Sequence, residues 1–156
     1  MKLPEIGKMA PDFELPNARG EQVSLRQLRG NKVVLFFYPK NNTPTCTQEA
    51  CDFRDAHAAF EAADTVLIGI SPDPVASHLK FADKHGLPFL LLSDEEHKVA
   101  EKYGVWQQKQ MFGRKYMGIV RSTFLIDREG NLAEQWRNVR IKGHIEAVLN
   151  AAKLLK

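Results

Sequence analysis

Hydrophobic and polar residues recur with different periods along this chain, and the periods predict its helices and strands. An unbroken apolar run of strand length, Val33–Tyr38, predicts a strand that is buried on both faces. Thr65–Ile70 predicts a second buried strand, and Phe89–Leu92 predicts a third short one. Apolar residues at helical spacing predict helices over Cys46–Ala63, Val75–His85, Asp94–Tyr103 and Ile141–Leu155. The expected inner face of the first helix consists of Cys46, Ala50, Phe53, His57 and Phe60.

Turn residues mark two β-hairpins and one loop. The loose alternation in Asp12–Leu25 is interrupted by the polar turn at residues 17–20, which predicts an N-terminal β-hairpin. The segments Ser122–Ile126 and Leu132–Trp136 are separated by Asp-Arg-Glu-Gly-Asn, a strong hairpin signal. The polar segment Gln107–Gly118 predicts a mobile loop, and the sequence leaves open whether this loop is a lid, a docking site for a partner or simply packed loop.

The order of these elements predicts the fold class. Strands that alternate with helices, followed by a hairpin and a terminal helix, indicate an α/β protein with a mixed central β-sheet flanked by helices. With 156 residues and a mass of 17.7 kDa, the chain is expected to form a single domain over residues 1–156.

Charge and hydropathy exclude several classes of partner. The formal net charge is +3, and the 22 lysines and arginines are spread along the chain. We therefore expect neither nucleic acid nor an anionic membrane as a partner. The N-terminal residues lack the apolar segment of a signal peptide, and no apolar run approaches the roughly 18 residues of a membrane span. These features predict a cytoplasmic protein.

The two cysteines, Cys46 and Cys51, are the main candidates for chemistry. Cys46 opens a predicted helix, where free backbone N–H groups and the helix dipole favour the nucleophilic thiolate. Two cysteines in a reducing compartment are more often catalytic or redox-active than structural. Five residues of α-helix separate two Cα atoms by about 8–9 Å, whereas a disulfide needs them within about 7 Å. If the cysteines are a redox pair, the first turns of the helix must therefore unwind when Cys46 is oxidised.

Acidity alone does not make a cysteine an efficient catalyst. Lowering the pKa of a thiol from about 8.5 to about 6 raises its thiolate fraction about thirtyfold, but lowers its nucleophilicity on the order of tenfold. The larger contribution must come from groups that position the electrophile and stabilise charge on its leaving oxygen. Arg121, just before a predicted strand, is the expected cation, and Thr43 is the expected hydroxyl. Pro39 is expected to fix the loop and shield the pocket.

Metal and nucleotide sites have little support in the sequence. The five histidines are scattered, and neither a C-x-x-C motif nor a histidine pair at zinc spacing is present. No glycine-rich phosphate loop of either common type occurs. We therefore expect no cofactor.

Several motifs together resemble one protein family. Pro39, Thr43 and Cys46 form the pattern P-x-x-x-T-x-x-C, and Arg121 opens RSTFLID. With YPKNNTPTCTQEACDFRD and YGVW in the same order, they resemble the peroxiredoxins, specifically the bacterioferritin comigratory protein subfamily. The resemblance covers nearly the whole chain. It departs at Asn41, where aspartate is common, and at Thr45, where glycine is common.

The resemblance implies a thioredoxin fold and a thiol peroxidase that reduces hydrogen peroxide and organic hydroperoxides without metal, haem or flavin. Cys46 matches the peroxidatic cysteine, which becomes a sulfenic acid, and Cys51 matches the resolving cysteine, which forms an intramolecular disulfide with it. Pro39, Thr43 and Arg121 match the rest of the peroxide pocket. Thioredoxin or a similar dithiol protein is the implied reductant. A monomer suffices, because both cysteines lie on one helix.

Two other functions are compatible with the sequence. A general disulfide oxidoreductase fits the implied fold, although the usual two-residue spacing between cysteines is absent. A redox-sensing or chaperone-like binding protein would use helix unwinding to expose apolar surface. Its supporting feature is the presence of Met111, Phe112 and Met117 in the predicted loop.

Overall fold

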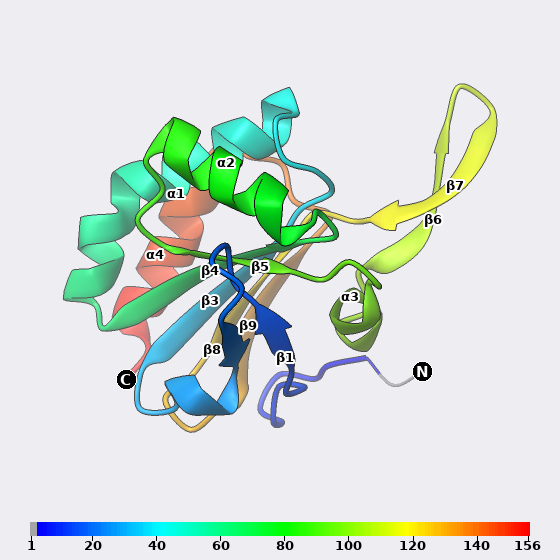
Figure 1. The fold of residues 1–156 in the computed structure, drawn as a ribbon. Coiled ribbons are helices and arrows are strands. Elements are labelled where there is room, and N and C mark those ends of the chain that lie inside the picture. Colours follow the sequence, from blue (N-terminus) through cyan, green and yellow to red (C-terminus); the bar gives the residue numbers. More distant parts are fainter. Residues whose placement is uncertain (1–2) are drawn as a thin grey trace.

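Residues 3–156 are described by a computed structural model, whose centre is a five-stranded β-sheet (Figure 1). Its strands are β3 (Lys32–Phe37), β4 (Thr65–Ser71), β5 (Leu90–Ser93), β8 (Ser122–Ile126) and β9 (Leu132–Arg137). Their spatial order is β5-β4-β3-β8-β9. β4 is parallel to β3 and to β5, whereas β8 is antiparallel to β3 and to β9. The predicted mixed sheet and the hairpin of β8 and β9 are thus confirmed.

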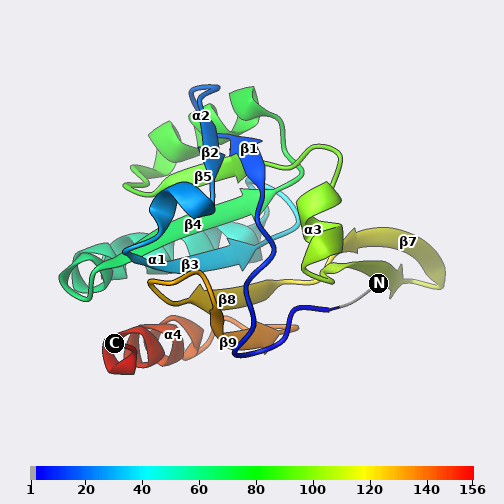
Figure 2. The same ribbon diagram turned by 90° about the horizontal axis from the view of Figure 1, so that it is seen from below.

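Both faces of this sheet are covered, as the unbroken apolar strands predict (Figure 2). The helices are α1 (Pro44–Ala62), α2 (Val75–His85), α3 (Lys98–Lys102) and α4 (His144–Leu154). Successive residues of β3 point to opposite faces, so Val34 and Phe36 pack with α1, α2 and α4, whereas Leu35 and Phe37 pack with α3 and the N-terminal segment. Within residues 3–156, no helix is long and apolar enough to cross a bilayer.

The N-terminal hairpin is confirmed. β1 (Glu14–Pro16) pairs antiparallel with β2 (Gln22–Ser24), and a 3₁₀ turn over Arg26–Leu28 follows. The side chain of Asn17 holds the turn between the strands, because its Oδ1 accepts the backbone N–H groups of Arg19 at 2.9 Å and of Glu21 at 3.0 Å.

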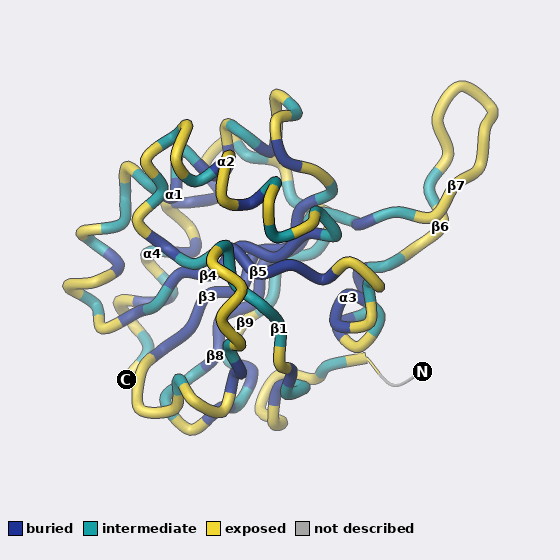
Figure 3. Tube along the Cα trace, viewed as in Figure 1, coloured by how far each residue is buried: buried dark blue, intermediate teal, exposed yellow. Residues whose placement is uncertain are grey.

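The prediction of a loop over Gln107–Gly118 is wrong. This segment is a β-hairpin in which β6 (Trp106–Met111) pairs in continuous register with β7 (Arg114–Ile119). Phe112 and Gly113 join the strands with φ angles of 52° and 76°, as in a two-residue type I′ turn. The hairpin stands away from the main sheet and is mostly exposed (Figure 3). Most of the hairpin is not covered by another layer of the protein, so its strands do not need alternating apolar residues. Without that alternation, the sequence pattern indicated a loop.

Helix boundaries and one face assignment also differ from the prediction. α1 starts at Pro44, two residues earlier than predicted. Proline is favoured at the first position of a helix, because the backbone N–H that it lacks would have no partner within the helix. His57 is half-buried rather than part of the inner face, and its Nδ1 lies 3.0 Å from Oε1 of Glu61. α3 begins only at Lys98, and the carboxylate of the preceding Asp94 accepts the backbone N–H groups of Val99 and Ala100 in its first turn.

Candidate active site

Cys46 lies at the junction of the central sheet and α1. β3 ends at Phe37 beside the parallel strand β4, and the chain then crosses to α1, where Cys46 is the third helical residue. Its side chain is 2% exposed and belongs to the apolar core beneath the helix. The N–H groups of a first helical turn have no partner within the helix and favour negative charge nearby. The fold thus places the Cys46 sulfur at a helix start, buried beside free backbone N–H groups.

Arg121 reaches this thiol from the segment that connects β7 to β8. Its Nη2 donates a hydrogen bond to Sγ of Cys46 at 3.1 Å. Burial alone lowers the pKa of Arg121, but the carboxylate of Glu49 and the Cys46 sulfur outweigh it and raise that pKa overall. The guanidinium therefore stays charged. Of the residues predicted to form the pocket, Arg121 is the one with a hydrogen bond to the sulfur within residues 3–156.

Glu49 is a residue of this site that the sequence analysis missed. Its carboxylate is fully buried, and its Oε1 accepts a hydrogen bond from Nη1 of Arg121 at 2.7 Å. Its Oε2 has no hydrogen-bond partner among residues 3–156. Burial raises the pKa of Glu49 to about 7, because desolvation outweighs the attraction of Arg121. One signal was available: Glu49 follows Cys46 by three positions, so both lie on the same face of the helix.

Thr43 and Pro39 occupy the loop before the helix, as predicted. Thr43 is the N-cap residue of α1, and its hydroxyl donates to the carbonyl of Lys40 at 2.9 Å. That bond leaves the lone pairs of the hydroxyl oxygen available as acceptors. Pro39 is half-buried and lines a hollow of about 500 Å³ together with Arg121. The hairpin supplies the facing wall of the hollow, with Gln107, Lys109, Gln110 and Tyr116.

Lys109 brings a second positive charge to this hollow. Its side chain is half-buried and lies within electrostatic range of both Arg121 and Cys46. Burial and the nearby Arg121 lower the pKa of Lys109, while the Cys46 sulfur acts in the opposite direction. Lys109 therefore adds to the positive charge that Arg121 brings to the surroundings of the Cys46 thiol.

A buried polar network anchors the loop that precedes Cys46. The hydroxyl of Tyr38 donates to Oδ1 of Asn41 at 2.7 Å, and the backbone N–H of Asn41 donates to Oδ2 of Asp73 at 2.9 Å. The amide of Asn41 also contacts Ser77 and Nδ1 of His78, each at 3.1 Å. Burial lowers the pKa of His78, so a neutral ring faces the neutral amide. Asn41, one of the two departures from the family pattern, thus has a defined structural role.

Cys51 lies apart from this group. It is half-buried on α1, and its Sγ is 3.9 Å from Nδ1 of His85. Both cysteines are free thiols. Because both belong to the same regular helix, the five-residue spacing keeps their Cα atoms about 8–9 Å apart, too far for a disulfide.

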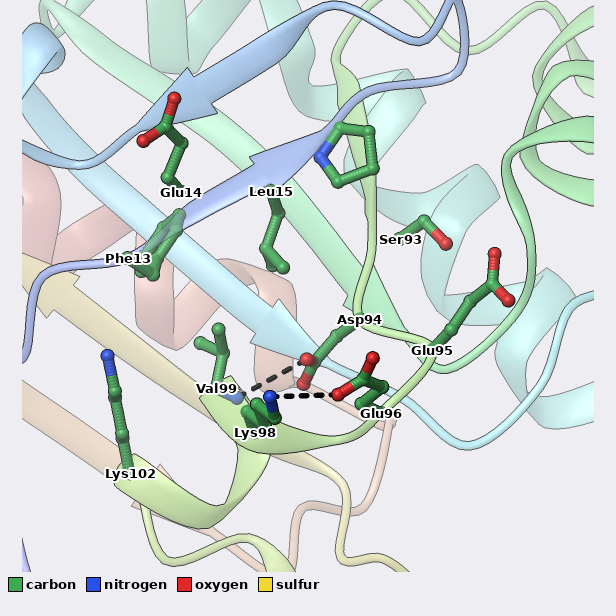
Figure 4. Close-up of a pocket in the computed structure, with 11 residues that line it drawn as sticks. Phe13, Glu14, Leu15, Ser93, Asp94, Glu95, Glu96, Lys98, Val99 and Lys102 are labelled. Carbon is green, nitrogen blue, oxygen red and sulfur yellow. Dashed lines mark hydrogen bonds and ion pairs between the residues drawn. The ribbon is translucent and has the colours of Figure 1, made fainter.

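A separate pocket of about 470 Å³ lies between the N-terminal hairpin and the start of α3 (Figure 4). None of the predicted site residues lines it. Its polar groups are used locally: Lys98 pairs with Glu96 at 2.9 Å, and Asp94 accepts the N–H of Ala100 at 2.9 Å. Asp94, Glu96 and Lys98 thus have partners within the segment that leads into α3.

Comparisons with known proteins agree with this geometry. The AhpC/TSA family model matches residues 6–135. The chain is 55% identical over 149 residues to peroxiredoxin Bcp of Bacillus subtilis, covering 96% of this chain and 95% of that protein. Peroxiredoxin Bcp of Escherichia coli is 42% identical over 149 residues, covering 96% of each chain.

Solved structures give the same assignment. The bacterioferritin comigratory protein of Xanthomonas campestris superposes with a TM-score of 0.89 at 37% identity, covering 96% of this chain and 98% of that one. A PrxQ mutant from Xylella fastidiosa superposes with a TM-score of 0.91 at 33% identity, covering 98% of each chain. The predicted thioredoxin fold is confirmed, and this chain belongs to the AhpC/TSA family as a peroxiredoxin of the Bcp type.

Proposed function

We propose that this protein is a thiol peroxidase in which Cys46 attacks the peroxide. The observation that carries the proposal is the contact of 3.1 Å between Nη2 of Arg121 and Sγ of Cys46. A fixed cation at the sulfur stabilises the thiolate before the reaction and the negative charge on the leaving oxygen during it. The Xanthomonas campestris relative has been studied for alkyl peroxide reduction. We extend this substrate class, together with hydrogen peroxide, to the present chain.

In the first step, the Cys46 thiolate attacks one peroxide oxygen and the O–O bond breaks. The sulfur becomes a sulfenic acid, and the other oxygen leaves as water or an alcohol after it gains a proton. Pro39 shields the pocket, and the hydroxyl oxygen of Thr43 orients the peroxide by accepting its hydrogen. Because Glu49 holds the second terminal nitrogen of Arg121 at 2.7 Å, the guanidinium reaches the reaction already oriented.

In the second step, Cys51 resolves the sulfenic acid as an intramolecular disulfide. The separation of the two cysteines along α1 requires the first turns of this helix to unwind. A dithiol protein such as thioredoxin then reduces the disulfide, and no cofactor takes part. The reaction needs one copy of the chain because both cysteines lie on one helix, and we place it in the cytoplasm as a single-domain monomer.

A coupled assay with peroxide, thioredoxin and its reductase tests this function. The wild type is expected to turn over, Cys46→Ser is expected to be inactive, and Cys51→Ser is expected to consume one equivalent of peroxide and then stop. Full turnover by Cys46→Ser overturns the proposal. Reduction of a model disulfide without peroxide consumption by the wild type identifies a general disulfide oxidoreductase instead.

A further inference from the structure

Cys51 lies against a histidine that the peroxide site does not use. Its Sγ atom is 3.9 Å from Nδ1 of His85, which is within hydrogen-bond reach for a sulfur atom. Cys51 belongs to α1 and His85 is the last residue of α2, so the packing of two helices creates the contact. The imidazole ring is also held edge-on by Phe81, with 4.9 Å between the ring centroids. The position of Nδ1 beside the thiol is therefore supported on two sides.

Arg54 ties the two helices together at the same place. Its Nη1 donates to the backbone carbonyl of His85 at 2.8 Å, and its Nε donates to Asp55 at 3.0 Å. The hydrogen bond to Asp55 raises the pKa of Arg54, and the nearby Cys51 sulfur acts in the same direction. The guanidinium is thus within electrostatic range of the Cys51 sulfur while it fixes the backbone of His85.

We propose that His85 is the general base of the resolving step. This rests on the proposed function, in which Cys51 attacks the sulfenic acid of Cys46. Nδ1 of His85 accepts the thiol proton of Cys51, the bond between the two sulfurs forms, and the S–O bond of the sulfenic acid breaks. The departing hydroxide gains a proton and leaves as water. One thiol and one sulfenic acid thus give one disulfide and one water, without any further reactant.

The sulfurs of Cys46 and Cys51 have different polar partners, and this difference matches the different reactions of the two cysteines. Cys46 must react with a dilute peroxide, so a standing thiolate held by Arg121 at 3.1 Å is useful. Cys51 reacts only after Cys46 is oxidised, so a base that removes its proton during the attack is sufficient. The base belongs to α2, outside the first turns of α1 that must unwind, and it contacts Cys51 at the end of that segment. His85 can therefore stay beside Cys51 while Cys46 moves.

Single-turnover kinetics of His85→Gln tests the proposal. The protein is mixed with one equivalent of hydrogen peroxide, quenched at intervals and alkylated, and mass spectrometry counts sulfenic acid and disulfide. Because a general base typically contributes a factor of 10² to 10⁴, we expect disulfide formation to slow about a hundredfold while oxidation of Cys46 is unchanged. His57→Gln is the matched control: this histidine is also half-buried beside α1 residues, but it pairs with Glu61. It should resolve at the wild-type rate.

The pH profile separates a base from a structural support. In the described part of the chain, the ionisable side chains with a hydrogen bond to His85 are Cys51, through Nδ1 of the ring, and Arg54, through the backbone carbonyl; both are on α1. Above the ordinary thiol pKa of about 8.5, a thiol ionises without help, so the defect of His85→Gln should shrink there. Added imidazole should also accelerate resolution in His85→Ala.

Three outcomes decide the matter. A wild-type resolution rate in His85→Gln overturns the proposal. A defect that is equal at all pH values and is not relieved by imidazole also overturns it, since this is the behaviour of a packing residue. If the wild type forms no disulfide between Cys46 and Cys51, the proposed function itself fails, whatever His85 does.

Discussion

Arg121 and Glu49 form an ion pair of 2.7 Å in which the carboxylate is fully buried and the guanidinium side chain is 13% exposed. The same guanidinium donates to Sγ of Cys46 through its other terminal nitrogen. A buried pair of this kind gives little net stability, because desolvation offsets the attraction. Its value here is geometric, since the planar fork of the arginine is held between the carboxylate and the sulfur.

Replacement of Arg121 by methionine is expected to slow oxidation of Cys46 by a factor of about 10² to 10³, as when one preorganised donor is removed from an active site. Rapid mixing with peroxide, monitored by intrinsic fluorescence or by thiol trapping, gives the second-order rate constant. Arg128→Met serves as the control, because Arg128 pairs with Asp64 at 3.1 Å on the surface. Equal rate constants in the wild type and in Arg121→Met would contradict the role given to Arg121.

The peroxide reaction is expected to weaken as Glu49 takes up a proton. Because burial raises the pKa of Glu49 to about 7, its carboxylate gains a proton as pH falls below 7 and its attraction for Arg121 declines. The oxidation rate of the wild type should therefore fall across this range. Glu49→Gln keeps an oxygen acceptor but does not titrate, so this component should be missing from its pH–rate profile. Identical profiles for the two proteins would exclude this role.

The carboxyl group of Glu49 also affects the stability of the fold. This effect has the opposite pH dependence to the effect on the oxidation rate. A folded-state pKa above the ordinary value of 4.5 means that the folded protein binds the proton more tightly than the unfolded chain does. The contribution of Glu49 to stability is therefore complete below pH 4.5 and is lost as pH rises through 7. Denaturant unfolding should show that Glu49→Gln gains stability relative to the wild type between pH 5 and pH 8. The ionisation that orients Arg121 thus lowers the stability of the fold.

The sequence predicts a residue of this site when the signal for it lies in neighbouring residues of the chain. It misses a residue whose role depends on a partner far away in the sequence. Cys46 was predicted from a strand, a turn and a helix start that are contiguous in the chain. Glu49 was missed because its partner Arg121 lies 72 positions away, so the sequence alone does not reveal that a carboxylate on the inner helix face is paired. Arg121 was expected because it directly precedes a buried strand, but its second contact became visible only in the fold.

The contact of Cys51 with His85 was missed for the same reason. The two residues are 34 positions apart on different helices, and helical periodicity does not specify how two helices pack. The hairpin of β6 and β7 was missed for another reason. Among residues 3–156 its strands pair only with each other, and they are largely exposed, so burial does not impose alternation on them. The turn uses Phe-Gly rather than the common Asn-Gly.

Acid should destabilise the protein through His144. This side chain is buried, and its Nε2 lies 2.8 Å from the hydroxyl of Thr123. Burial lowers the pKa of His144 from 6.5 to about 4, and the charge of Arg121 adds to this effect. Its contribution to stability is therefore complete above pH 6.5 and is lost as pH falls through 4.

The size of this effect can be measured with His144→Gln, which retains a polar side chain but does not titrate. Between pH 7 and pH 5 the wild type should lose about 2 kcal/mol more unfolding free energy than the variant does, from the relation between pKa shift and stability. Denaturant titrations at the two pH values give the comparison. The same loss in both proteins would show that His144 is not the responsible group.

Unwinding of the first turns of α1 is expected to accompany disulfide formation, since the intact helix keeps Cys46 and Cys51 about 8–9 Å apart at Cα. Amide hydrogen exchange of residues 46–51 should be faster in the oxidised protein than in the reduced one. Residues 53–62 of the same helix carry Phe53 and Phe60, which are fully buried in the core, and should keep their protection in both states. They are the internal control for global loosening. Equal protection of residues 46–51 in the two states would mean that the cysteines meet by some other movement, and faster exchange along the whole helix would mean that α1 detaches as a unit.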